Sequence, residues 1–237
     1  MPKLVAPGIH LLEVSWPEPI GANAYLVDDR DVHSNASKAT AEEVTLVDCG
    51  LPIPRRSLVG ELRRAGYEPT GIDRVLLTHY DIDHVGGLAR LDIDAPVFMG
   101  AADVALLRRS WSPPWCHHKA AFHRLVRRVY GLDGVDLRPV KDGDRVGGFR
   151  AIHTPGHNPG HTVYVHDTLD AAFLGDLVWE SGGEFMTPPW IDSYDTTRIV
   201  ESVRRVAGER FEHACVGHGT PVTPDGDEAL HRLAAAQ

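Results

Sequence analysis

One seven-residue stretch constrains this chain more than any other part of its sequence, namely Thr78-His79-Tyr80-Asp81-Ile82-Asp83-His84. An apolar run at 75–77 precedes it and a Gly-Gly pair follows after one residue. This order is typical of a short buried strand that ends in polar side chains and turns into a helix. His79 and Asp81 would project to the same side of an extended segment, whereas Asp83 and His84 are adjacent and must point in different directions. One segment can therefore hold two neighbouring metal ions.

Four further motifs flank this stretch. They are Leu46-Val47-Asp48-Cys49-Gly50, Thr154-Pro155-Gly156-His157-Asn158-Pro159-Gly160-His161, Phe173-Leu174-Gly175-Asp176 and Val216-Gly217-His218-Gly219. In this order, the five motifs resemble those of the metallo-β-lactamase superfamily, whose signature is His-x-His-x-Asp-His. Asp81 departs from the signature, because the family usually has its second His there.

The resemblance implies an α+β fold, an αββα four-layer sandwich with the site where the strands end. Many short apolar runs mixed with helical patterns also favour two sheets covered by helices. The length of 237 residues suits one domain, 1–237. Residues 110–132 interrupt the alternation with Trp, Pro and His, and we expect a helical lid insertion there.

The resemblance also implies a ligand set. Site one would take His79, Asp81 and His157, site two would take Asp83, His84 and His218, and Asp176 would bridge both. An Asp oxygen is as many bonds from Cβ as the near ring nitrogen of His, so we expect Asp81 to bind the metal directly. The alternative is that Asp81 bonds locally and site one is incomplete.

We expect two divalent metal ions, zinc first, with iron or manganese open because Asp81 adds an oxygen donor. Two cations would bring the pKa of a bridging water near neutrality and yield hydroxide as the nucleophile. Asp83 is the expected catalytic residue, which orients the nucleophile and passes a proton to the leaving group. Asp48 either accepts the N–H of a ligand histidine or forms a turn before Gly50.

Asp176 aligns the chain with the glyoxalase II and lactonase-like branches of the family, which implies a hydrolase acting on a thioester, lactone or related ester. Trp179 stands where quorum-sensing lactonases have Tyr, and little chain follows His218, where glyoxalase II has a further helical region. The alternatives are an iron-dependent oxygenase or oxidoreductase of the persulfide dioxygenase kind, and a phosphodiesterase.

Aromatic side chains in the irregular stretches are expected to line a substrate pocket, with core packing as the alternative; they are Trp111, Trp115, Trp179, Phe185 and Trp190. A third metal is conceivable at Cys116, His117, His118 and His123. No closed ligand spacing emerges there, so exposed imidazoles at a helix start are the preferred interpretation.

Composition restricts the partners. With 24 Lys and Arg against 33 Asp and Glu, the formal net charge is −9. A negative net charge does not indicate binding to nucleic acid or to an anionic membrane. No apolar run approaches the length of a membrane span, and the N-terminus lacks the apolar core of a signal peptide. Three cysteines fit no disulfide framework. We therefore expect a cytoplasmic enzyme with a small-molecule substrate; the sequence makes no prediction of oligomeric state.

Overall fold

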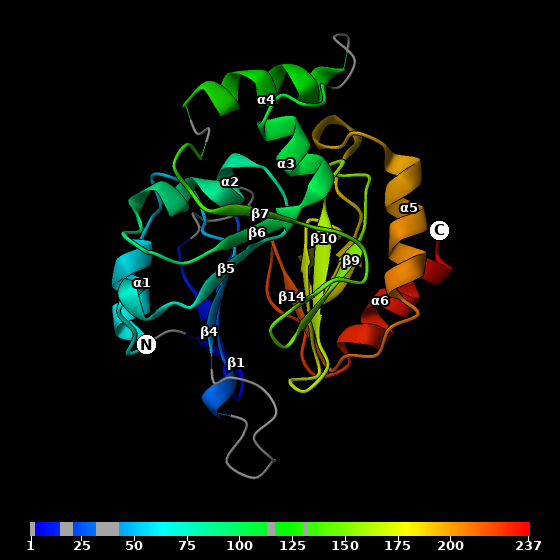
Figure 1. The fold of residues 1–237 in the computed structure, drawn as a ribbon. Coiled ribbons are helices and arrows are strands. Elements are labelled where there is room, and N and C mark those ends of the chain that lie inside the picture. The colour runs from blue at the N-terminus through cyan, green and yellow to red at the C-terminus, as the bar shows by residue number, and fades with distance from the viewer. Residues whose placement is uncertain (1–2, 15–20, 32–42, 113–116, 130–131) are drawn as a thin grey trace.

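Two β-sheets face each other at the centre of the molecule (Figure 1). The computed structural model describes residues 3–14, 21–31, 43–112, 117–129 and 132–237. The first sheet has the strand order β1 (Lys3–Ala6), β2 (Ile9–Leu12), β3 (Ala24–Asp28), β4 (Val44–Val47), β5 (Arg74–Leu77), β6 (Val97–Gly100), β7 (Leu137–Val140). The second has the order β14 (His213–Val216), β11 (Ala171–Gly175), β10 (Thr162–His166), β9 (Phe149–His153), β8 (Arg145–Val146). A separate hairpin pairs β12 (Trp179–Ser181) with β13 (Glu184–Met186).

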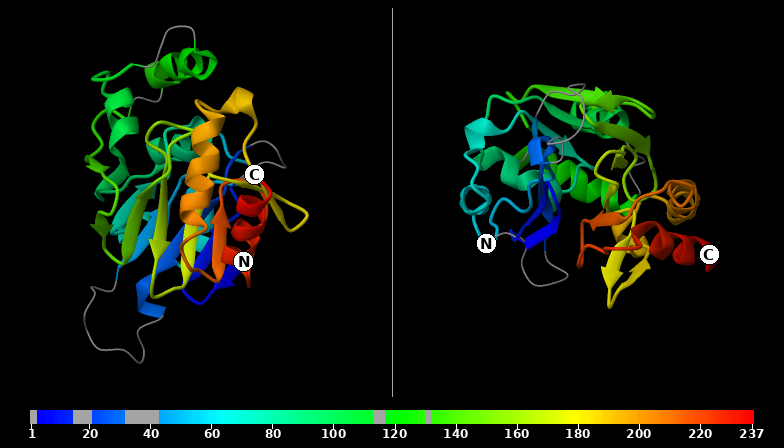
Figure 2. Two further views of the ribbon diagram at one scale, coloured as in Figure 1. Left: turned by 90° about the vertical axis from the view of Figure 1, so that its right-hand side faces the viewer. Right: turned by 90° about the horizontal axis from the view of Figure 1, so that it is seen from below.

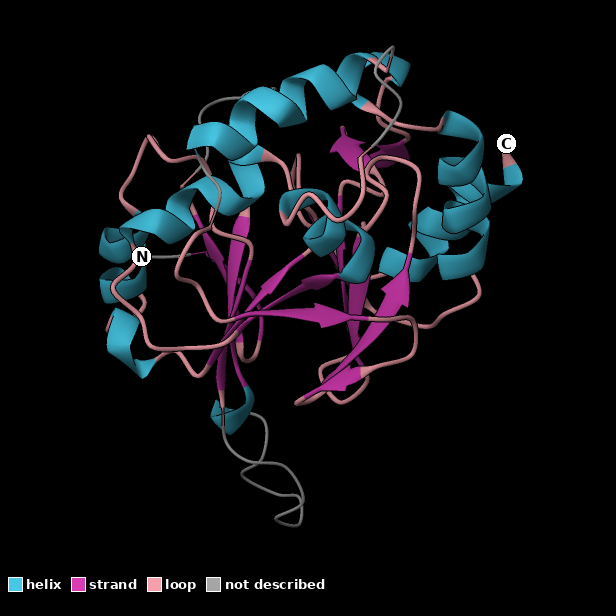
Figure 3. Ribbon diagram, turned by 45° about the horizontal axis from the view of Figure 1, so that its top comes forward, coloured by secondary structure: helices cyan, strands magenta, loops and turns pink. Residues whose placement is uncertain are grey.

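Helices cover the outer face of each sheet. The first sheet carries α1 (Leu58–Arg64), α2 (Ile82–Val85) and α3 (Ala101–Leu107), and the second carries α5 (Thr196–Val206) and α6 (Gly226–Ala235). Figure 2 shows α5 and α6 in front of the second sheet in its left view. Helix α4 (His118–Val129) lies across the top of the molecule (Figure 3). The order helix, sheet, sheet, helix is the αββα sandwich that the sequence predicts.

Short 3-10 turns complete the described elements: η1 (Asp29–Asp31), η3 (Pro69–Gly71), η4 (Gly86–Arg90) and η5 (Trp190–Asp192). Helix α1 begins at Leu58 because the Ser57 hydroxyl caps it by accepting from the Gly60 N–H. The segment between β12 and α5 contains β13 and η5. Among the described residues, no helix combines the length and the apolar character needed to cross a membrane.

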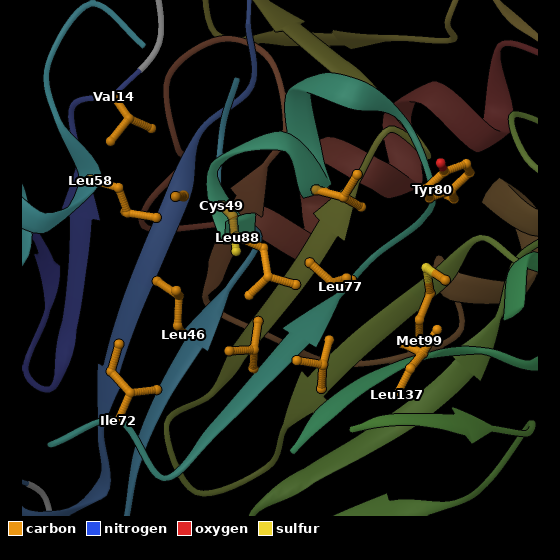
Figure 4. Packing of buried hydrophobic residues seen from close by; sticks show 14 of the residues in the cluster. Val14, Leu46, Cys49, Leu58, Ile72, Leu77, Tyr80, Leu88, Met99 and Leu137 are labelled. Atoms are coloured by element: carbon orange, nitrogen blue, oxygen red, sulfur yellow. The ribbon is translucent and has the colours of Figure 1, made fainter. Parts of the chain in front are cut away.

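Alternation along the strands creates three apolar layers. Leu46 of β4 and Leu77 of β5 point outward and pack against the helices, as Figure 4 shows, whereas Val47 and Leu76 point inward between the sheets. Phe173 of β11 meets them from the opposite sheet. Because successive side chains of a strand point to opposite faces, each sheet contributes to two layers at once.

The strand directions bring the sequence motifs to one edge. Strands β4, β5, β6 and β7 are mutually parallel, and β11 is parallel to β14. Carboxyl ends of parallel strands meet at the same edge of a sheet. Asp48 follows β4, residues 78–84 follow β5, Asp176 follows β11 and residues 217–219 follow β14. The motifs therefore converge although they are far apart in the sequence.

Truncating Phe173 should test the layer between the sheets. Its ring is 1% exposed and lies edge-on to Tyr25, with 5.6 Å between ring centroids. We expect Phe173→Ala to lower the free energy of unfolding of the metal-free protein by about 3–5 kcal/mol in urea titrations. Phe122→Ala, at a ring that is 46% exposed, is the matched control and should change it by about 0.5 kcal/mol or less. Equal losses in both variants would contradict this packing.

Candidate metal centre

The side chains predicted as metal ligands meet at the carboxyl edge of the sheets. Their donor atoms form overlapping groups in which all atoms lie within 4.8 Å of one another. The groups are His79 with Asp81 and His157, Asp83 with His84 and His218, Asp176 with His79 and His84, and Asp192, which the motifs do not include, with His157 and Asp176. The structure thus brings together all seven residues that the motif resemblance implies.

The site-one group has the spacing of a metal site. His79 Nε2 lies 3.5 Å from Asp81 Oδ2 and 3.2 Å from His157 Nε2, and the latter two atoms are 3.1 Å apart. Ligands bound tetrahedrally at about 2.0–2.1 Å are separated by roughly 3.3 Å. The arrangement is therefore that of three ligands around one small cation.

Asp176 connects this group to site two. Its Oδ1 lies 3.2 Å from His84 Nε2, and its Oδ2 lies 3.2 Å from His218 Nε2 and 3.6 Å from His157 Nε2. Asp83 Oδ2 approaches His218 Nε2 at 3.4 Å. Among the described residues, buried His84 Nε2 and Asp176 Oδ1 find no partner with hydrogen-bonding geometry. Two buried polar atoms so close together, with no hydrogen bond to satisfy them, fit a divalent cation between them.

Asp48 fixes the orientation of His84. Its Oδ2 lies 2.8 Å from His84 Nδ1 and also accepts from the Thr78 hydroxyl, while its Oδ1 accepts from the Thr78 N–H. A carboxylate only accepts, so Nδ1 carries the proton and Nε2 faces Asp176. Asp48 has φ 56°, which lies in the left-handed region. The two sequence alternatives therefore coexist, because the residue forms the turn and contacts a ligand histidine.

Two further polar residues hold the ligand loops. Asp103, in the first turn of α3, is fully buried and accepts from the backbone N–H groups of Tyr80 and Gly160 at 2.9 and 2.6 Å. His161 Nε2 accepts from the Asp176 N–H at 3.0 Å. Asp103 thereby joins two ligand loops, and His161 fixes the backbone of Asp176. The sequence analysis missed Asp103, because a lone Asp in a helix start carries no motif.

Gly217 is required by the closeness of the ligands. A Cβ at this position would lie 2.2 Å from Asp176 Oδ1 and 2.9 Å from His84 Cε1. Any side chain would therefore displace the Asp176 carboxylate. This contact explains why Gly precedes the ligand His218 in the last motif.

Helix α4 adds two residues that the motifs do not contain. Lys119 Nζ lies 2.8 Å from Asp81 Oδ2 and 2.9 Å from His157 Nε2. His123 Nε2 donates to Asp81 Oδ1 at 2.6 Å, and its Nδ1 accepts from the Tyr194 hydroxyl at 2.9 Å. Their spacing of four residues, which puts them on one helix face, is the signal that could have paired them.

The interpretation of His123 as an exposed imidazole was wrong, because its side chain is completely buried. His118 is exposed, and His117 stacks on Tyr194 with 4.5 Å between ring centroids. Cys116 lies outside the described residues. Within the part of the chain that the structure describes, none of the groups with metal-binding geometry contains these histidines.

The predicted pocket residues occupy different surroundings. Trp179 Nε1 donates to Asp176 Oδ2 at 3.2 Å, and its ring lies 4.9 Å from that of His218. Trp190, in η5, is 67% exposed and lies beside the His118 ring. Trp111 follows α3 and is exposed, and Trp115 is outside the described residues. Phe185 is buried in the outer apolar cluster beside α6, so the structure does not bring it to the ligands.

Charges within the centre shift several pKa values. Burial raises the pKa of Asp81, but Lys119, His79 and His123 outweigh burial and hold it well below its usual range. Burial likewise raises the pKa of Asp176, but His218 and His84 bring it well below its usual range. The two carboxylates are therefore ionised at neutral pH and available to cations.

The pKa values of the histidines shift in opposite directions. Burial lowers the pKa of His218, but Asp176 and Asp83 raise it to about 10. Asp48 and Asp176 similarly overcome burial at His84, whose pKa lies well above its usual range. Burial and the neighbouring His84 keep the pKa of His79 well below its usual range. In the metal-free protein, site two is thus the more strongly protonated group.

An αββα sandwich with His and Asp groups at its strand ends is the architecture of a metal-dependent hydrolase. The chain belongs to the metallo-β-lactamase superfamily, whose family model matches residues 18–227. It is 24% identical to the probable metallo-hydrolase YflN of Bacillus subtilis (strain 168), over 92% of this chain and 86% of that protein. It is 32% identical to a hydroxyacylglutathione hydrolase of Rhodopseudomonas palustris (strain BisA53), over 86% and 70% of the two chains.

Solved structures show the same fold. The metallo-β-lactamase family protein TTHA1429 of Thermus thermophilus superposes with a TM-score of 0.66 at 25% identity, covering 98% of this chain and 80% of that chain. TTHA1623, solved in a di-iron-bound form, gives a TM-score of 0.67 at 25% identity, covering 95% and 99%. Family membership and the His and Asp groups together support divalent metal binding and a hydrolase activity.

Metal binding should release protons. The pKa of His218 is about 10, so at pH 8 its Nε2 proton must leave before that atom can bind a cation. The apparent affinity for zinc should therefore rise as pH increases, by about tenfold per pH unit for each proton released. Calorimetric titration of the metal-free protein in buffers of different ionisation enthalpy measures the proton count.

His218→Gln should release about one proton fewer per ion than the wild type, because Gln carries no titrating proton. His231→Gln, at an exposed histidine on α6, is the matched control. A zinc affinity that is independent of pH in the wild type would contradict the prediction.

Proposed function

We propose that this chain hydrolyses a small ester-like molecule, a thioester, lactone or related ester, with zinc in its metal centre. The observation that carries the proposal is the Asp176 carboxylate, whose Oδ1 lies 3.2 Å from His84 Nε2 and whose Oδ2 lies 3.2 Å from His218 Nε2. A carboxylate at this position is the feature that connects the chain to glyoxalase II and the lactonase-like branch. The relative at 32% identity is named for the hydrolysis of hydroxyacylglutathione, which supports the same substrate class.

Divalent zinc would supply an activated water at neutral pH and polarise the scissile carbonyl. Asp83 is the residue suited to carry protons, since its side chain is 21% exposed while those of Asp81 and Asp176 are 8% and 3% exposed. It can take a proton inside the centre and exchange it with solvent. Asp48 keeps His84 oriented, and Trp179 holds one oxygen of Asp176.

Helix α4 and η5 lie next to each other over the ligand loops, joined by contacts of Lys119 with Asp192 and of His118 with Trp190. These two segments are the proposed lid, and they would select the substrate. The thiols of Cys49 and Cys215 are buried and free, which supports the cytoplasmic location that we propose for this chemistry.

The competing proposal is an iron-dependent oxygenase or oxidoreductase. Asp81 favours it, because an oxygen donor in the first group suits iron, and one structural relative was solved with two irons. The metal content of protein from cells supplied with zinc, iron and manganese together distinguishes the two. Predominant iron would favour the oxygenase, and predominant zinc the hydrolase.

Chelation should abolish hydrolysis and lower the melting temperature, because ligands from separate loops are joined by the metal only in the folded state. Added zinc should restore both. The measurement uses a panel of thioesters, lactones and phosphodiesters, followed by thermal unfolding with and without chelator. Full activity in excess chelator would contradict the proposal. Turnover of phosphodiesters alone would favour the phosphodiesterase alternative.

Asp83→Asn should lower kcat on the preferred ester by about 10²–10⁴-fold, the range expected when a proton-transferring group is lost. Its control is Asp136→Asn. Asp136 is exposed and directly precedes β7, at the strand end away from the ligands, so this variant should leave kcat unchanged. Metal content should be measured alongside, so that loss of metal is separated from loss of proton transfer. An unchanged kcat in Asp83→Asn would exclude the proposed role.

A further inference from the structure

Lys119 is a buried lysine inside the metal centre. It is the second residue of α4 and its side chain is 2% exposed. Its ammonium lies 2.8 Å from Asp81 Oδ2 and 2.9 Å from His157 Nε2, two of the three donors of site one. An ammonium that replaced a metal ion would contact the donors at this hydrogen-bonding distance.

Neighbouring groups hold the ammonium at this place. Lys119 Nζ donates to the Asp192 carbonyl at 2.7 Å and to the His157 carbonyl at 3.4 Å, and Asp192 Oδ1 lies 3.8 Å away. His123 and Asn158 both donate to Asp81 Oδ1, at 2.6 and 2.8 Å. The Oδ2 atom of Asp81 thereby faces the lysine, as do the carbonyl oxygens of Asp192 and His157.

Among the carboxylates of the two ligand groups, the one of site one is already paired with an ammonium, and Asp192 brings a further carboxylate to 3.8 Å from the same nitrogen. Site two contains Asp83 and Asp176, whose two negative charges match one divalent cation. Asp81 is the negative charge of site one, and Lys119 already matches it at 2.8 Å. Buried charges persist when they are paired. A second divalent ion, bonded to the same Asp81 and His157 atoms as Lys119, would place like charges in close contact.

The departure of the chain from the family signature fits this arrangement. A neutral His at position 81 would offer no negative charge to a buried lysine, whereas Asp81 offers one. His79 and His157 then serve as neutral donors beside the ammonium. Asp in place of His at position 81 makes site one more negative. The site is therefore suited to hold the ammonium group of Lys119.

We propose that Lys119 takes the place of the metal ion at site one, so that the chain binds a single divalent ion, at Asp83, His84, Asp176 and His218. The ammonium of Lys119 then supplies the second positive charge of the centre. The inference rests on the proposed function only in that site two holds a divalent ion, and it does not depend on which ester is cleaved.

Metal stoichiometry tests the inference. Metal-free protein is loaded with excess zinc, freed of unbound metal and measured by mass spectrometry. We expect about one zinc per chain in the wild type and in the control Lys141→Ala, whose lysine is exposed. Lys119→Ala should hold about two, because removal of the ammonium opens site one. Lys119→Met, with a neutral side chain of similar length, should do the same if the alanine variant unfolds.

The other outcomes overturn the proposal. Two zinc ions in the wild type would show that the lysine gives way to metal, and a fall from two to one in Lys119→Ala would make it a ligand. One zinc in both Lys119 variants would also contradict the replacement. No zinc in the wild type would overturn the proposed hydrolase as well, so the two failures are distinguishable. Titration with Co²⁺, followed by its visible absorption, provides the count independently.

Discussion

Buried carboxylates at the strand ends organise this molecule, and each one ties together segments from different parts of the chain. Asp48 joins the end of β4 to Thr78 and His84 after β5. Asp103 joins α3 to two ligand loops. Asp81 joins the central motif to α4, and Asp176 reaches histidines of three motifs. Because a buried carboxylate needs partners, the ligand loops cannot separate without exposing or isolating a charge.

The same edge also joins the two sheets. The Tyr25 hydroxyl of β3 donates to the Val216 carbonyl of β14 at 2.7 Å, and the Asn23 N–H donates to the Gly217 carbonyl. The Thr162 N–H, at the start of β10 in the second sheet, donates to the carbonyl of Thr78, which follows β5 of the first sheet. Ligands from both sheets are thus held on a frame that is already connected without metal. A bound cation adds to this frame because it binds the folded arrangement of the ligands.

Helix α4 adds to the centre two residues that the five sequence motifs do not contain. The family resemblance accounts for the histidines and the bridging Asp176, whereas the lysine and His123 come from a segment outside the motifs. Their contacts with Asp81 connect the helix above the site to the one position where the signature differs. The segment expected to be a lid therefore takes part in the charge balance of the centre.

The sequence by itself determined the fold class and the seven residues that gather at the site. Both are what the resemblance of five short motifs to a known family implies, and these motifs can be found in the sequence because each is local and follows an apolar run. Only the tertiary structure decided which partners those donors meet. His123 is 42 residues from Asp81, and Asp103 is 57 residues from Gly160, so their contacts depend on how α3 and α4 pack. Phe185 likewise lies in the core because β13 pairs and packs on α6, which no short-range pattern of residues reports.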